Sequence, residues 1–168
     1  MNLKQVTLRS CRTDDRDTLQ ALTIEAFDGV TLEQNVEDAL GILAGHDWTW
    51  RKARHVDEDM KACPQGLFVA EYDGEIVGYI STRVDTDAGK GRIPNLVVAA
   101  EHRGHGLGRV LIEHALEWFR QERLEYAVIE TMAQNEIGNH LYRSCGFQEV
   151  ARQIHFARRL GPADAPET

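Results

Sequence analysis

The pattern of hydrophobic and polar residues along the chain predicts a series of strands and helices. Apolar residues at every second position are typical of a half-buried strand, whereas apolar residues three and four positions apart are typical of one face of a helix. By this test, strands are expected at residues 6–12, 66–82 (a hairpin), 91–98, 125–132 and 150–160, and helices at residues 13–27, 107–120 and 135–145. Residues 28–64 are polar, are interrupted by glycines, and fit one or two short helices.

This order of elements predicts the fold class. Strands cluster at the start and middle of the chain and then alternate with helices, which favours an α/β fold with a mixed sheet covered by helices on both faces. The clearest local signal is the hairpin, because Asp73-Gly74 stands between two strand-like runs and suits a tight turn. We expect a single domain over residues 1–160 and a flexible C-terminal tail over residues 161–168.

Composition and charge exclude several classes of function. The length of 168 residues fits one domain. Because the 27 acidic residues outnumber the 19 basic ones, the net charge is -8, and we expect no nucleic acid as a partner. The chain has no apolar run of membrane-spanning length and no apolar secretion signal at its start, so we expect no membrane association and a cytoplasmic location.

The cysteine and histidine residues do not form a metal-binding pattern. The three cysteines are isolated, and no CxxC pair is present. His102, His105 and His114 lie near one another in the sequence but lack a fourth ligand at a convincing spacing. We therefore expect no metal, and we interpret these histidines as solvated surface residues.

A glycine-rich loop before the helix at residues 107–120 is the strongest candidate for chemistry. Gly104, Gly106 and Gly108 occupy alternate positions, and backbone N–H groups at the start of a helix can bind a phosphate. A Walker A loop would need Lys-Ser/Thr where the chain has Arg109-Val110, and a dinucleotide fingerprint would need a third glycine at Arg109. Taken alone, the loop is equally consistent with a tight strand-to-helix turn.

Two motifs in the correct order resemble those of a known family. The segment "LVVAAEHRGHGLGRVLI" resembles the acetyl-CoA-binding motif of the GCN5-related N-acetyltransferase (GNAT) superfamily, through Leu96, Val98, Arg103, Gly104, Gly106 and Gly108. The segment "NEIGNHLYRSCGF" resembles a later motif of that family, through Asn135, Leu141, Tyr142, Gly146 and Phe147. The chain differs from the family pattern in having alanine at position 100, where proline is frequent, and glycine at position 138, where alanine is usual.

The resemblance implies the α/β (α+β) GNAT fold, with a central mixed, mostly antiparallel sheet and helices on both faces. It also implies a cosubstrate and the residues that bind it. The cosubstrate is acetyl-CoA, and its pyrophosphate is expected on the loop formed by Arg103, Gly104, His105, Gly106, Leu107 and Gly108. The pantetheine arm is expected beside the main chain of Leu96 and Val98, with the Val98 amide facing the thioester oxygen. We expect Asn135 to bond the arm and Tyr142 to be the general acid, both on one face of a helix because they are seven residues apart.

The general base is harder to place. Glu130 resembles the catalytic glutamate of the bacterial ribosomal-protein N-terminal acetyltransferases, and it is our candidate for the base or for a residue that orders a water molecule. A change of strand register by one residue would turn Glu130 to the opposite face. The position that histone-type relatives use for the base corresponds to Arg92, which cannot serve.

These observations give two functional hypotheses. The first is an N-acetyltransferase that transfers acetyl from acetyl-CoA to a primary amine, such as a peptide N-terminus, an amino acid or a small amine, by direct attack in a ternary complex. The alternative is a non-catalytic acyl-CoA-binding sensor or interaction module. A homodimer is a family-level expectation. The sequence does not identify the acceptor.

Overall fold

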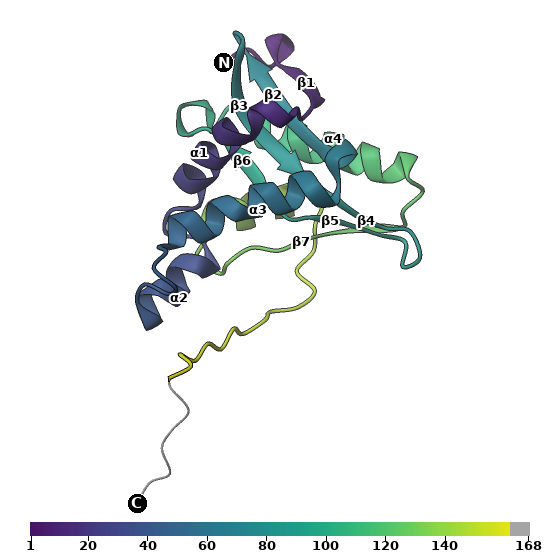
Figure 1. Ribbon diagram of the computed structural model, residues 1–168. Coiled ribbons are helices and arrows are strands. Elements are labelled where there is room, and N and C mark those ends of the chain that lie inside the picture. Colours follow the sequence, from purple (N-terminus) through teal and green to yellow (C-terminus); the bar gives the residue numbers. More distant parts are fainter. Residues whose placement is uncertain (162–168) are drawn as a thin grey trace, which may run out of the picture.

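Seven strands form two sheets in residues 1–161, the part of the chain that the computed structural model describes (Figure 1). The first sheet has the order β1-β2-β3-β6, with antiparallel neighbours: β1 (Thr7–Ser10), β2 (Leu67–Tyr72), β3 (Glu75–Ser81) and β6 (Leu96–Val98). In the second sheet, β4 (Arg83–Asp85) is antiparallel to β5 (Lys90–Ile93), and β5 is parallel to β7 (Tyr126–Ile129). The predicted mixed, mostly antiparallel arrangement is confirmed, although it is divided into two sheets.

Helices cover both faces of the first sheet. They are α1 (Arg16–Phe27), α2 (Leu32–Leu40), α3 (Trp48–Ala62), α4 (Leu107–Gln121) and α5 (Glu136–Ser144). Helices α1 and α3 pack against each other, and α1 also contacts β3 and β6. Helix α4 contacts the same two strands from the opposite face. Short 3-10 turns occur at Leu3–Gln5, Thr13–Asp15, Pro64–Gly66 and Ala100–His102.

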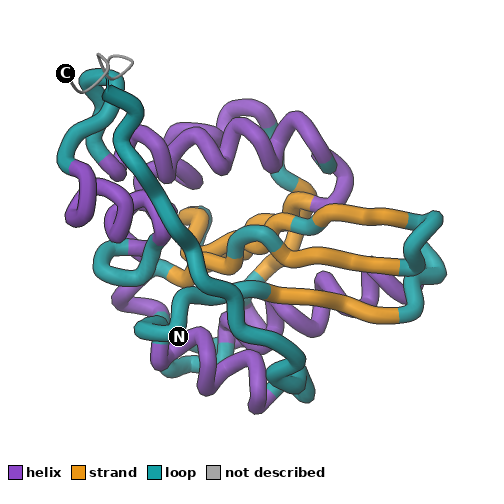
Figure 2. Tube along the Cα trace, turned by 90° about the horizontal axis from the view of Figure 1, so that it is seen from below, coloured by secondary structure: helices purple, strands orange, loops and turns teal. Residues whose placement is uncertain are grey.

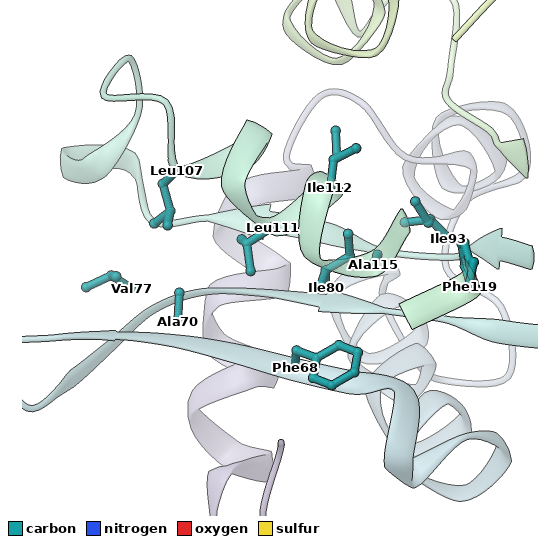
Figure 3. Close-up of a cluster of buried hydrophobic side chains, with 10 residues drawn as sticks. All are labelled: Phe68, Ala70, Val77, Ile80, Ile93, Leu107, Leu111, Ile112, Ala115 and Phe119. Atoms are coloured by element: carbon teal, nitrogen blue, oxygen red, sulfur yellow. The ribbon is translucent and has the colours of Figure 1, made fainter. Parts of the chain in front are cut away.

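The alternation of side chains along β2 and β3 divides the hydrophobic core between these two faces. Ala70 and Ile80 point toward α4 and join a cluster with Leu107, Leu111, Ile112, Ala115 and Phe119 (Figure 3). Their sequence neighbours Val69 and Tyr79 belong to the second cluster, with Leu19 and Val56 from α1 and α3. Side chains on both faces of the first sheet are therefore buried. This packing holds strand β6 in position.

The predicted hairpin is confirmed, with its turn at the expected residues. Asp73 and Gly74 have positive φ angles of 51° and 84°, the conformation that a tight two-residue turn requires. The predicted single strand at residues 91–98 is wrong. Pro94 and Asn95 interrupt it, so Ile93 pairs with β7 whereas Leu96 pairs with β3. The two sheets separate at this interruption.

The predicted strand at residues 150–160 is also absent from the structure. These residues have no regular secondary structure and are exposed to solvent. A strand requires a hydrogen-bonded neighbour, and none of the seven strands pairs with this segment within residues 1–161. Of the predicted flexible tail, residues 162–168 lie outside the described residues.

Candidate active site

Strand β6 presents one free edge where the two sheets separate. Ser81 N–H donates to Asn95 O at 2.9 Å, and Ala99 N–H donates to Val77 O at 2.9 Å, so residues 95 and 99 direct their backbone groups toward β3. Because these directions alternate along a strand, the backbone N–H groups of Leu96 and Val98 point the other way, where no strand of residues 1–161 pairs with β6. An extended ligand can use this edge as it would a neighbouring strand.

The glycine loop follows β6 and leads into α4. Gly104 and Gly106 have positive φ angles of 77° and 88°, and Gly106 is the residue that precedes the helix. Within residues 1–161, the backbone N–H groups of residues 104–108 donate to no protein acceptor. The first N–H groups of a helix lack intrahelical partners, and with the helix dipole they favour an anion. Arg103 joins this loop to β6, because its Nε donates to Val98 O at 3.1 Å.

Gly108 has a packing role that the sequence did not distinguish from phosphate binding. A Cβ atom added at Gly108 would lie 2.9 Å from Cδ2 of Leu141 in α5 and 3.9 Å from Cγ2 of Val98. The missing side chain therefore allows α4, α5 and β6 to approach closely. This contact places the start of α4, strand β6 and Leu141 of α5, the residue before Tyr142, next to one another.

Tyr142 lies in α5 beside the core. Its ring packs against Phe147 with a centroid separation of 6.5 Å. Burial raises the pKa of Tyr142 to about 12, because the phenolate would lose hydration. No group in the described part of the chain hydrogen-bonds the Tyr142 hydroxyl, so a ligand can accept its proton.

Asn135 lies at the N-cap of α5, the helix that carries Tyr142. Asn135 precedes α5, and its side-chain oxygen accepts a hydrogen bond from Gly138 N–H at 3.0 Å. Its amide nitrogen donates to Oγ1 of Thr131 at 2.9 Å. A Cβ atom at Gly138 would lie 2.6 Å from Nδ2 of Asn135, so the glycine that replaces the usual alanine leaves space for this helix cap.

Glu130 follows β7, and its side chain is 65% exposed. The carboxylate accepts hydrogen bonds from Arg92 in β5, at 3.1 Å from Nε and 2.5 Å from Nη2. Glu130 and Arg92, the two positions considered for the general base, therefore form an ion pair between neighbouring strands. Within residues 1–161, no hydrogen bond or ion pair joins Glu130 to Tyr142.

A buried polar cluster on the α3 side of β6 was not predicted. Lys52 is 5% exposed, and its Nζ donates to Oδ1 of Asn95 at 2.9 Å. Nδ2 of Asn95 donates to Asp59 at 2.7 Å, and Asp59 also pairs with Arg83 at 2.6 Å. A spacing of seven residues places Lys52 and Asp59 on one face of α3, which is the signal that could have identified them.

His55 and Glu33 extend this cluster toward solvent. Nε2 of His55 lies 2.9 Å from Glu33, and Nδ1 lies 3.3 Å from Nζ of Lys52. Burial lowers the pKa of Lys52 to about 8, although the carboxylates of Glu33 and Asp59 oppose this shift. Burial disfavours ionised Glu33, but hydrogen bonds from His55 and Thr31 lower the pKa of Glu33 to about 2. The cluster fixes Asn95, the residue directly before β6.

The predicted surface histidines have different environments. His105 is exposed in the loop, and the half-buried ring of His102 contacts Tyr72 at a centroid separation of 5.8 Å. His114 packs edge-on against Phe68, and burial lowers the pKa of His114. No group of three or more potential metal ligands occurs within residues 1–161. Among these residues, none of the helices is long and apolar enough to span a membrane.

Comparison with known proteins assigns the family. The sequence model of the acetyltransferase (GNAT) family matches residues 33–147, and the chain belongs to this family. The chain is 29% identical over 110 residues to an N-alpha-acetyltransferase of Sulfurisphaera tokodaii, a match that covers 59% of this chain and 66% of that protein. It is 32% identical over 103 residues to a mycothiol acetyltransferase of Tsukamurella paurometabola, covering 56% of this chain and 35% of that protein.

A solved structure supports the fold independently. The PaiA N-acetyltransferase of Thermoplasma acidophilum, solved in complex with coenzyme A, superposes with a TM-score of 0.68 at 18% identity. The superposition covers 85% of this chain and 89% of that one. The GNAT fold predicted from the two motifs is confirmed. The sequence matches span less than two thirds of the length of the two relatives named above.

Proposed function

We propose that the chain is an N-acetyltransferase that transfers acetyl from acetyl-CoA to a primary amine by direct attack in a ternary complex. The observation that carries the proposal is the close packing of β6, α4 and α5 around Gly108. The unpaired amides of residues 104–108 lie at the start of α4, Leu96 and Val98 lie on the free edge of β6, and Tyr142 follows Leu141 in α5. Together they supply sites for a pyrophosphate, an extended amide-containing arm and a leaving thiolate.

The residues have separate roles in this proposal. The amine nitrogen attacks the thioester carbon, and the N–H of Val98 donates to the oxygen that becomes negative. When the carbon–sulfur bond breaks, Tyr142 gives its proton to the departing thiolate. The proton that the amine loses passes to Glu130, directly or through water. Since Tyr142 has a pKa of about 12, it remains protonated over the working range of pH, as a general acid must.

The acceptor class is proposed as a peptide N-terminus, an amino acid or a small amine. The name of the Sulfurisphaera relative favours a terminal α-amine, whereas the Tsukamurella relative is named for the small molecule mycothiol. We further propose that residues 1–160 form the single catalytic domain and that it works in the cytoplasm.

A transfer assay with labelled acetyl-CoA tests the proposal. Acceptors are peptides with varied N-terminal residues, free amino acids, polyamines and amino sugars, and products are resolved by mass. A labelled amide supports the proposal and identifies the acceptor class. Acetyl-CoA binding without a product from any acceptor would contradict it and support the non-catalytic acyl-CoA sensor.

Replacing Tyr142 with phenylalanine tests the acid. Because the ring and its packing against Phe147 are retained, we expect unchanged stability and acetyl-CoA affinity. We expect kcat to fall by about 10²–10⁴-fold, the usual contribution of a general acid. Rapid-mixing kinetics and acetyl-CoA titration separate the two effects, and an unchanged kcat would remove Tyr142 from the mechanism.

A further inference from the structure

The chain passes between the two sheets at two neighbouring places. Thr82 joins β3 of the first sheet to β4 of the second, and Pro94 and Asn95 join β5 of the second sheet to β6 of the first. Beyond this break, β5 keeps β7 as a neighbour, whereas no described strand pairs with the outer edge of β6. The break therefore sets the position of the free edge of β6 relative to the second sheet.

Asn95 is held at this break by hydrogen bonds from its backbone and its side chain. Its backbone N–H donates to Oγ of Ser81 at 3.1 Å, and its backbone oxygen accepts from the N–H of Ser81 at 2.9 Å. Its side-chain oxygen accepts from Nζ of Lys52 at 2.9 Å, and its side-chain nitrogen donates to Asp59 at 2.7 Å. Asn95 is 3% exposed, so the loss of a partner would leave a buried polar group unsatisfied.

Asp59 connects the two sides of the break. Its Oδ2 accepts from Nδ2 of Asn95, beside β6, and its Oδ1 accepts from Nη2 of Arg83, in β4, at 2.6 Å. Helix α3, which carries both Asp59 and Lys52, crosses the strands here (Figure 1), and Figure 2 shows helices above and below the strands. A single buried carboxylate on α3 therefore binds one residue of the second sheet and one residue next to the first.

The chemistry of this network suits it to fixing geometry. Buried ionic networks contribute little to stability, because well-packed apolar residues of similar volume often replace them without loss. Apolar contacts are non-directional, whereas hydrogen bonds depend on distance and angle. Lys52, Asn95 and Asp59 are all buried, so a shift of β6 relative to α3 would break hydrogen bonds that water cannot replace.

We propose that Asn95 and Asp59 are positioning residues that hold the free edge of β6 at a fixed place beside the second sheet. Their role rests on the proposed function, in which acetyl-CoA binds along β6. The N–H groups of Leu96 and Val98, which face the pantetheine arm and the thioester oxygen in that proposal, follow directly after Asn95. A misplacement of about 1 Å in a reacting complex can cost about a hundredfold in rate, so the place of this edge matters for the reaction.

Exchanging the side chains at these two positions tests the role. In Asp59→Asn, the new amide has one oxygen for the two donors Asn95 and Arg83, so one donor loses its acceptor. In Asn95→Asp, a new carboxylate faces the carboxylate of Asp59. In Asp59→Asn/Asn95→Asp, the amide at position 59 donates to the carboxylate at position 95, which still accepts from Lys52, and the net charge is unchanged.

Calorimetric titration with coenzyme A measures the effect without requiring acetyl transfer. We expect each single variant to raise the dissociation constant by at least about tenfold, and the double variant to return it to within about threefold of the wild type. Asp57→Asn is the matched control, because it removes a carboxylate of α3 that pairs with Arg16 of α1 at 2.6 Å, away from the break. The control should bind coenzyme A as the wild type does.

Circular dichroism verifies that the variants are folded. Where a single change at position 59 or 95 prevents folding, Arg83→Gln replaces it, because Arg83 lies at the partly exposed end of the network. This variant should raise the dissociation constant for coenzyme A by at least about threefold. An unchanged dissociation constant in Arg83→Gln and in every folded single variant would overturn the proposal.

Hydrogen exchange locates the effect at the edge of β6. Saturating coenzyme A should slow the exchange of the Leu96 and Val98 amides in the wild type and in Asp59→Asn/Asn95→Asp, and much less in the single variants. A double variant that binds no better than the single variants would also overturn the positioning role. If the wild type binds coenzyme A but transfers no acetyl, the catalytic proposal fails while these binding measurements still decide the role of Asn95 and Asp59. A wild type that does not bind coenzyme A would overturn both.

Discussion

At the scale of the residue, Asn135 has a structural role at a position where the sequence suggested ligand binding. Asn135 caps α5 with its oxygen and bonds Thr131 with its nitrogen. Its spacing from Tyr142 placed both residues on one helix, and the structure has Asn135 at the cap position, one residue before the helix begins at Glu136. Sequence periodicity locates helix ends less well than helix centres, because capping residues adopt non-helical angles.

Two substitutions of Asn135 separate capping from cofactor binding. Asn135→Ala should lower the free energy of unfolding by about 1 kcal/mol, because the Gly138 N–H loses its acceptor. Asn135→Asp retains a capping oxygen and should preserve stability. Urea unfolding measures both variants, and KM for acetyl-CoA serves as the second readout. If both variants raise KM without destabilising the fold, the side chain acts mainly on the pantetheine arm.

Lys52 makes a pH-dependent contribution to stability. Its pKa is about 8 in the folded chain and 10.5 when unperturbed, so between these values the unfolded chain holds more protons than the folded one. Stability from this group therefore increases as pH rises through that interval. Compared with Lys52→Met, the wild type should gain on the order of 2 kcal/mol between pH 7 and pH 10. Parallel stability curves for the two proteins would show that Lys52 does not titrate there.

At the scale of the element, the sequence predicted those parts whose signal is local. The hairpin turn at Asp73 and Gly74 depends on two residues that accept positive φ, and the structure has it at these positions. The amphipathic helix α4 was likewise located from its own pattern. The interruption at Pro94 and the absence of a strand over residues 150–160 depend on pairing between distant segments, which periodicity does not encode.

The glycine loop gives an element-scale prediction. Gly106 has φ of 88°, so Gly106→Val strains the turn, and the branched side chain obstructs the amides that would hold phosphate. Calorimetric titration should show acetyl-CoA affinity reduced by at least about tenfold, a loss of roughly 1.4 kcal/mol. Gly74→Val is the control, because it imposes a similar strain at φ of 84° in the hairpin turn. Equal affinity in the two variants would place the pyrophosphate elsewhere.

At the scale of the whole molecule, the two faces of the first sheet carry different groups of residues. The α4 face carries the loop, Gly108 and Tyr142, whereas the α3 face carries the buried charges around Lys52 and Asn95. Strand β6 contributes to both faces. Its backbone forms the free edge, and Asn95, which belongs to the buried polar cluster, directly precedes it. The sequence motifs identified the first face. The second was not predicted, because Asn95 and Arg83, the partners of Lys52 and Asp59, come from distant segments and are recognisable as partners only in the folded chain.

Concentration should change the stability of the whole molecule if the chain forms the homodimer that is expected from its family. Only folded chains associate into the dimer, so by mass action a higher protein concentration raises the melting temperature. Tenfold more protein should add up to about 1.4 kcal/mol per dimer at low dissociation. Differential scanning calorimetry of the wild type over a wide range of protein concentration should show this increase. A melting temperature independent of concentration would contradict the homodimer, because association of folded chains must couple folding to concentration.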